Sequence, residues 1–198
     1  AGGTVVLGVR ESATPMAYAL GANEKYVGYH VELCEKVVRA IAPQAQLKYM
    51  VLTAQNTMPL IQNGTADFNC ASMTNNLNRQ KQVAFGQTTY VSEVRMAVRA
   101  DSGITSFRQL QGRNVGAITG TTSVQILRKY ASDNELNFKT LMSKDQFESF
   151  LMLESGRVDA FVLDDNMLAG VIGQSKNPKG YKIVGEVIGA EPVAIQFS

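Results

Sequence analysis

Short apolar runs alternate with segments of helical period along the whole chain, and this alternation most constrains the fold. The run "TVVLGV" at 4–9 is typical of a strand, and "YHVELCEKVVRAIA" at 29–42 predicts an amphipathic helix that ends before Pro43. Further predicted strands are 46–52, 66–72, 93–99, 114–118, 137–142, 158–165 and 181–185, and further predicted helices are 58–64, 104–112, 122–132, 144–156 and 166–174. Such alternation predicts an α/β fold with βα units around mainly parallel sheets.

The composition is that of an ordinary globular protein. With 198 residues, of which 45% are hydrophobic and 18% charged, the chain can form one large domain or two lobes of about 100 residues each. The net charge is +2 without a dense basic block, so we expect no nucleic-acid partner. No apolar run approaches the ~20 residues that span a bilayer. Because the sequence opens directly on a strand pattern, we expect any export signal to be absent from it.

The cysteines leave two possibilities open. Cys34 and Cys70 lack CxxC spacing, and with His30 as the single histidine they cannot form an ordinary zinc site, so we expect no metal. A disulfide between them would favour an oxidising compartment, whereas two buried free thiols would not.

A short internal echo suggests where the chain divides. "LIQNGTADF" at 60–68 and "LMLESGRVDAF" at 151–161 both run from a helix into Gly, then Asp three residues later, then a strand. Either two similar lobes are repeated, or this is common helix-to-strand punctuation. Ligands of open α/β sheets bind beyond the carboxyl ends of strands, so paired lobes would enclose a site.

The segment "SMTNNLNRQKQ" at 72–82 predicts an anion site. Ser72, Thr74 and Asn75 follow a strand where free backbone N–H groups point outward, and Arg79 can form a bidentate contact with a carboxylate. Such a charge-assisted contact contributes about 1.5–3 kcal/mol. A capped helix beside a solvated arginine is the alternative.

Two segments of the second half complete the pattern. "GTTS" at 120–123 places a helix N-terminus after a strand and lacks the Walker A lysine, so it is either a carboxylate cup or a plain cap. "FVLDDN" at 161–166 places Asp164 and Asp165 at a strand end, where either could meet a cation or be solvated. An arginine, N–H-rich strand ends and an aspartate together suit an α-amino acid.

The chain resembles the family 3 periplasmic amino-acid-binding proteins of ABC importers, and most closely the glutamate/aspartate-binding branch. The resemblance spans essentially all residues and rests on "LGVRESATP", "QNTMPLIQNGTADF", "SMTNNLNRQKQVAF", "GTTS", "LESGRVDAF" and "LDDNMLAG", in that order. It implies a type II periplasmic-binding-protein-like fold with two lobes and two hinge crossings, near 89–92 and 191–194. Lobe one would be 1–90 plus 192–198, and lobe two 91–191. Relatives continue beyond this point with helices of lobe one, so lobe one is expected to be incomplete here.

The resemblance also implies roles for individual residues. Arg79 would bind the ligand α-carboxylate, and Arg10 would face the ligand side chain. The remaining expected contacts are N–H groups at Thr74 and Thr122 for the α-carboxylate, Ser72 and Asp165 for the ammonium, and Thr57 and Gln146 for the side chain. Asp165 is preferred over Asp164 as the residue directly preceding the final helix.

The expected function is capture of an acidic L-amino acid, glutamate or aspartate, in the periplasm and its delivery to an ABC permease by a monomer without a cofactor. Binding of a neutral polar amino acid, such as glutamine or asparagine, is the alternative. A dehydratase-type enzyme on this fold would need a positioned acid or base, and His30 is expected to be solvated, so no catalytic residue is predicted. The effector domain of a receptor or regulator is disfavoured because no helix-turn-helix or membrane segment is visible.

Overall fold

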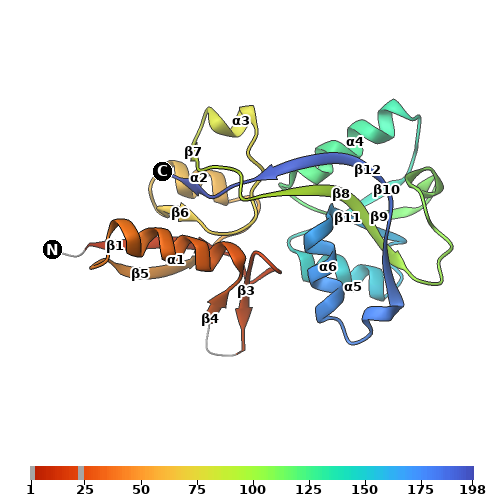
Figure 1. Ribbon diagram of the computed structural model, residues 1–198. Coiled ribbons are helices and arrows are strands. Elements are labelled where there is room, and N and C mark those ends of the chain that lie inside the picture. The colour runs from red at the N-terminus through yellow and green to blue at the C-terminus, as the bar shows by residue number, and fades with distance from the viewer. Residues whose placement is uncertain (1–2, 22–24) are drawn as a thin grey trace. The chain divides into compact units, whose positions relative to one another are not determined.

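The computed structural model describes residues 3–21 and 25–198, and it separates into two compact units (Figure 1). The first unit runs to Val91 and resumes at Pro192–Ser198, and the second unit is Ser92–Glu191. The chain therefore passes between the units twice, within strands β8 (Tyr90–Arg99) and β12 (Tyr181–Val193).

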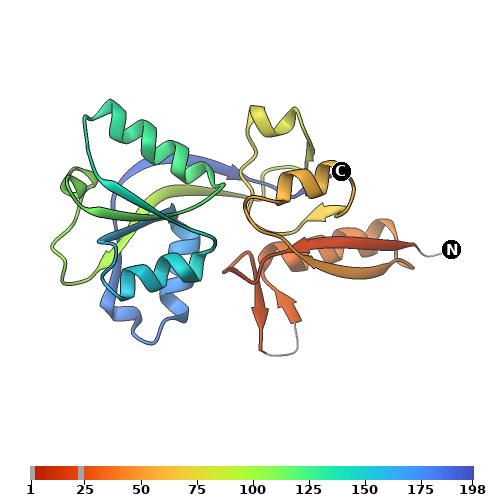
Figure 2. The same ribbon diagram turned by 180° about the vertical axis from the view of Figure 1, so that it is seen from behind.

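The first unit is built on a five-stranded mixed sheet with the order β5-β1-β6-β13-β7. Its strands are β1 (Thr4–Val9), β5 (Gln46–Val51), β6 (Phe68–Asn69), β7 (Ala84–Phe85) and β13 (Gln196–Phe197), and its helices are α1 (Tyr29–Ile41), α2 (Thr57–Gln62) and α3 (Leu77–Gln80). Strands β5 and β6 pair with β1 in parallel, whereas β13 is antiparallel to β6 and β7. A small antiparallel sheet is formed by β2 (Ser12–Ala13), β3 (Ala17–Leu20) and β4 (Lys25–Val27). Helix α1 lies in front of β1 in Figure 1 and behind it in Figure 2.

The second unit repeats this plan with the order β10-β9-β11-β8-β12. Its further elements are β9 (Asn114–Ile118), α4 (Thr122–Asp133), β10 (Lys139–Ser143), α5 (Gln146–Glu154), β11 (Ala160–Asp164) and α6 (Asp165–Gln174), with short 3-10 helices at Phe107–Leu110 and Pro178–Gly180. Strands β10 and β11 are parallel to β9, and β8 is antiparallel to β11. Helix α4 covers one face of the sheet, and α5 and α6 cover the other (Figures 1 and 2).

The Gly-x-x-Asp echo marks a structural repeat. The strand orders β5-β1-β6 and β10-β9-β11 are the same, and the glycine before each third strand has a positive φ, 73° at Gly64 and 76° at Gly156. The Asp67 carboxylate accepts the N–H of Val6 at 2.7 Å while its own N–H donates to the carbonyl of Val6. The corresponding residues of the second half make the same pair of hydrogen bonds. Each aspartate therefore holds the strand that follows it against the central strand of its sheet.

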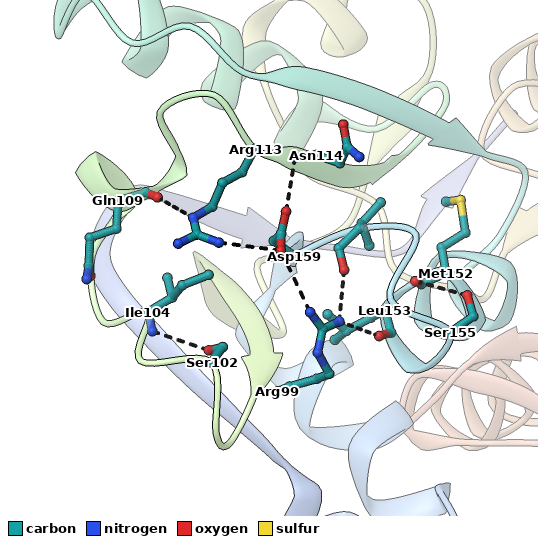
Figure 3. A network of polar contacts seen from close by, with 11 residues as sticks. Arg99, Ser102, Ile104, Gln109, Arg113, Asn114, Met152, Leu153, Ser155 and Asp159 are labelled. Carbon is teal, nitrogen blue, oxygen red and sulfur yellow. Dashed lines mark hydrogen bonds and ion pairs between the residues drawn. The ribbon is translucent and has the colours of Figure 1, made fainter.

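That second pair joins Asp159 to Asn114 at the start of β9, with the carboxylate accepting the N–H of Asn114 at 3.2 Å. Two arginines, Arg99 and Arg113, add ion pairs to Asp159 at 3.7 and 3.5 Å (Figure 3). The Arg99 guanidinium also donates to the carbonyls of Leu153, in the last turn of α5, and Val158, just before β11. Glycine allows the left-handed turn that ends the helix, and the aspartate then fixes the register of the next strand.

Each unit has its own core, and a disulfide joins α1 to the end of β6 in the first unit. Cys34 and Cys70 are fully buried and bonded, with an S–S distance of 2.17 Å and a sequence separation of 36 residues. This decides between the two possibilities that the spacing left open. In the second unit Phe107, Leu110 and Leu127 are fully buried or nearly so and pack with the inward residues of β8 and β11.

Three local predictions differ from the structure. Strand β6 has two residues where 66–72 was predicted. The N–H of Cys70 still donates to the Gly8 carbonyl of β1, but the N–H of Ala71 donates to the Asn69 side chain. The helix predicted over 104–112 is only a four-residue 3-10 helix, opened by a capping box between Ser106 and Gln109. Strand β12 runs eight residues beyond the predicted 181–185 because it continues to Val193 as a neighbour of β8.

Candidate ligand-binding site

In the first unit, the predicted site residues follow strands at one edge of the sheet. Strands β1 and β6 are parallel neighbours, with Gly8 in register with Asn69, so the residues after both strands lie at the same edge. Arg10 directly follows β1, and Ser72 and Thr74 follow β6. Thr57 begins α2, after the carboxyl end of β5. The structure therefore gathers the predicted residues of this unit in one place.

Arg10 is held there by a weak contact and is largely withdrawn from water. Its Nη2 lies 3.4 Å from the Thr57 hydroxyl, and its Nε is buried without a hydrogen-bond partner from the residues that the structure describes. Among the described residues no carboxylate forms an ion pair with Arg10. Desolvation, followed by the positive charge of Arg79, lowers the pKa of Arg10 to about 10. A guanidinium in this state is stabilised by any anion that reaches it.

Arg79 is anchored beside it by the backbone of the segment after β6. The Asn76 side chain accepts the N–H of Arg79 at 2.9 Å and caps α3, and the Arg79 guanidinium donates to the Thr74 carbonyl at 3.0 Å. Thr74 is itself fixed by an antiparallel bridge to Val193. Two guanidinium groups that repel each other are therefore held in place by the fold. Because Arg forms bidentate bonds with carboxylates, the pair suits a ligand with two carboxylates.

In the second unit, the predicted residues also follow parallel strands. Thr122, Gln146 and Asp165 are the first residues of α4, α5 and α6, which come after β9, β10 and β11. The Thr121 hydroxyl donates back to the Ile118 carbonyl instead of capping α4, so it does not occupy the N–H groups of the first turn. The Gln146 amide is buried and donates to the Met167 carbonyl at 2.8 Å, which joins α5 to α6. Gln146 thus has an internal structural contact that spacing alone did not indicate.

Asp165 was preferred over Asp164 as the residue directly before the last α-helix, but the structure places Asp164 in that position. Helix α6 begins at Asp165, so the residue directly preceding it is Asp164. The Asp165 carboxylate accepts the N–H groups of Glu93 and Asn166 at 3.1 and 2.8 Å. Asp164 is 5% exposed and accepts hydroxyl groups from Ser92 at 2.8 Å and from Ser123 at 3.3 Å. The Asp164 carboxylate therefore accepts hydrogen bonds from side-chain hydroxyls, whereas the Asp165 carboxylate accepts them from backbone N–H groups.

The charge state of Asp164 is perturbed by its surroundings. Burial, together with the negative charge of Glu191 and a hydrogen bond to it, raises the pKa of Asp164 to about 8, while the bonds from Ser92 and Ser123 act in the opposite direction. Perturbed carboxyl groups at a strand end are typical of functional sites. Sequence reasoning missed Glu191, because nothing in its local pattern separates it from a surface residue of a strand.

The expectation that His30 is solvated was wrong. Its ring is fully buried, with Nδ1 2.7 Å from the Ala71 carbonyl and Nε2 2.6 Å from the Thr89 hydroxyl. Burial lowers the pKa of His30. The ring joins α1 to the segment that carries Ser72. Helical spacing could have revealed this, because His30 lies four and eight residues before the buried Cys34 and Val38.

A separate apolar hollow of about 200 Å³ lies on the first unit, lined by Leu33, Val37, Phe68, Ile195 and Phe197 among others. It offers no charged side chain and is distinct from the predicted site. None of the described helices combines the length and apolarity needed to cross a membrane.

Comparison with known proteins places this chain in a family. Residues 5–179 match the bacterial extracellular solute-binding proteins, family 3. The chain is 40% identical over 189 residues to the glutamate/aspartate import solute-binding protein of Salmonella typhimurium and 37% identical over 188 residues to the L-glutamate/L-aspartate-binding protein of Pseudomonas aeruginosa. These matches cover 93% and 92% of this chain, which spans 62% of the length of each relative.

A solved structure supports the same conclusion. An ancestral arginine-binding protein bound to glutamine is similar with a TM-score of 0.86 and 29% identity, over 98% of this chain and 83% of that one. The predicted α/β fold class is confirmed, and so is the resemblance that the motifs indicated. The chain belongs to the bacterial extracellular solute-binding proteins of family 3.

Proposed function

We propose that this chain binds an acidic L-amino acid, glutamate or aspartate, as the solute-binding component of an ABC importer outside the cytoplasm. The observation that carries the proposal is the pair Arg10 and Arg79, two guanidinium groups close enough to lower the pKa of Arg10 and held by Thr57 and Thr74. The names of the relatives from Salmonella typhimurium and Pseudomonas aeruginosa support the same ligands.

The proposed roles follow from the charges. Arg79, with N–H groups at Thr74 and Thr122, binds the α-carboxylate. Arg10 binds the side-chain carboxylate, with hydroxyl and amide contacts from Thr57 and Gln146.

The ammonium is assigned to Ser72 and, in place of Asp165, to Asp164. This change rests on the start of α6 and on the buried, side-chain-bonded carboxylate of Asp164. Asp165 stays the alternative ammonium partner, and substitution of each aspartate by Asn separates the two.

The proposed protein is a monomer that acts in the periplasm, hands its ligand to a membrane permease and carries no catalytic residue. The relatives are named as import and binding proteins, which supports a transport role over an enzymatic one. A neutral polar ligand is the second candidate, because Thr57 and Gln146 are both uncharged and the similar ancestral protein holds glutamine.

A thermal-shift screen of the twenty amino acids tests the proposal. A ligand at 100 times its dissociation constant stabilises the protein by about 2.7 kcal/mol, which is readily measured as a rise in Tm. Glutamate and aspartate should give the largest shifts. Arg10→Gln should weaken their binding more than that of glutamine, whereas the exposed Arg128→Gln should change neither. A shift with neutral or basic amino acids but none with glutamate or aspartate contradicts the proposal.

A further inference from the structure

Two buried carboxyl groups, those of Asp164 and Glu191, lie close enough for the charge of Glu191 to act on Asp164. Asp164 ends β11 and is 5% exposed, and Glu191 lies on β12 and is 2% exposed. The Ser92 hydroxyl stands between their strands, 2.8 Å from the Asp164 carboxylate and 3.5 Å from the Glu191 backbone carbonyl. Among the described residues neither carboxyl group forms an ion pair. Two adjacent buried carboxylates without a counter-charge repel each other and each loses its hydration.

The hydrogen bonding around these two carboxyl groups lacks one donor. Each oxygen of Asp164 accepts one hydroxyl group, Oδ2 from Ser92 and Oδ1 from Ser123. The Oε1 atom of Glu191 is buried and has no hydrogen-bond partner in the part of the chain that the structure describes. A single proton held by the two carboxyl groups removes one negative charge and supplies a donor for the bond between them. Buried polar atoms are nearly always satisfied, so this arrangement points to a bound proton.

Within residues 3–21 and 25–198, no other charged group packed around Asp164 can take the place of that proton. On β8, Glu93 is exposed and the Arg95 guanidinium donates to the Gly185 carbonyl. On α6, Asp165 accepts backbone N–H groups. The contribution of α4 is the Ser123 hydroxyl, and the charged residues of α5, Glu148 and Glu154, are exposed.

We propose that Asp164 and Glu191 share one proton in the unliganded protein, and that binding of the ligand's ammonium to Asp164 releases this proton to the solvent. The exchange balances at the carboxyl pair, because one positive charge leaves as the ammonium arrives, while the two carboxylates of the ligand are neutralised by Arg10 and Arg79. The raised pKa of Asp164 supports a carboxyl group that is protonated before the ligand binds. The proton-release step rests on the proposed function, whereas the shared proton does not. Glu191 acts as a positioning residue that keeps Asp164 protonated until a ligand arrives.

Calorimetry of L-glutamate binding in buffers of low and high ionisation enthalpy tests the release. At a pH of about 6.5, above the ordinary carboxyl pKa and below the raised one, the slope of binding enthalpy against buffer enthalpy should show about one proton released. As pH increases, affinity should also rise about tenfold per pH unit up to the raised pKa of Asp164 and level off above it. Binding with an enthalpy that is independent of the buffer overturns the release.

Two variants locate the proton. Glu191→Gln places an amide donor beside Asp164 and should bring the released proton toward zero while glutamate still binds. The matched control Glu93→Gln removes an exposed carboxyl group from the neighbouring strand and should leave the release at about one. Equal release from Glu191→Gln and wild type overturns the assignment to this pair.

A measurement without ligand separates this inference from the proposed function. Infrared spectra of the unliganded protein at neutral pH should show a protonated carboxyl C=O band that is absent from Asp164→Asn. If the band is present and no amino acid binds, the proposed function and the release fail while the shared proton stands. If glutamate binds and the band is missing from the wild type, the shared proton is refuted and the proposed function stands.

Discussion

Reduction of the Cys34–Cys70 disulfide should destabilise the first unit strongly. The bond closes a loop of 36 residues that includes most of α1, β5 and α2. On a chain-entropy basis, releasing a loop of this length from its cross-link stabilises the unfolded state by about 4 kcal/mol at 25 °C. Both cysteines are fully buried, so the double variant Cys34→Ala/Cys70→Ala should lose a further contribution from packing.

Hydrogen exchange followed by mass spectrometry measures this effect segment by segment. Between oxidised wild type and the double variant, the most protected amides of β1 and α1 should differ by about 4 kcal/mol or more in opening free energy. Amides of β9 and α4 in the second unit form an internal control, because the loop does not include them. Ligand affinity should fall too, since Cys70 lies two residues before Ser72.

A loss below about 1 kcal/mol in β1 and α1 would refute the reasoning, because the entropy of loop closure alone predicts several times more. An equal loss in β9 and α4 would show that the two units unfold together, and the control would then have to come from a variant outside the loop.

Four further predictions concern single side chains. Arg79→Ala should weaken ligand binding at least tenfold, or about 1.4 kcal/mol, while the Tm of the unliganded protein stays near that of the wild type; unchanged affinity by calorimetry would remove Arg79 from the site. Burial lowers the pKa of His30, so its contribution to stability should be lost as pH falls below about 6.5, and His30→Gln should flatten that part of the urea-midpoint profile. Asp164 has a raised pKa, so its contribution should instead be lost as pH rises toward about 8, and a profile of Asp164→Asn that matches wild type would contradict this. Asp159→Asn should cost about 1–2 kcal/mol of unfolding free energy, against less than about 0.5 kcal/mol for the exposed Asp133→Asn; equal losses would show that the Asp159 network adds nothing.

Much of the fold was predictable because its signals are local. Residues 29–42 show a helical period and residues 4–9 an apolar run, and both elements are confirmed within one or two residues. The Gly-x-x-Asp echo was visible, but its meaning needed the structure. Only the two hydrogen bonds from each aspartate to the central strand separate a repeat from common punctuation.

The sequence by itself determined most of the succession of strands and helices, although not the small sheet of β2, β3 and β4, and it placed Arg10, Thr74 and Arg79 in the segments that follow strands. Only the tertiary structure decided which of these groups meet. Strand order, set by packing between distant segments, brings Arg10 beside Arg79, Cys34 against Cys70, and Asp164 beside Glu191. Hydrophobic period is a property of neighbours along the chain, whereas desolvation and charge coupling depend on neighbours in space. For that reason His30 was misjudged, and the buried carboxyl pair could not be predicted.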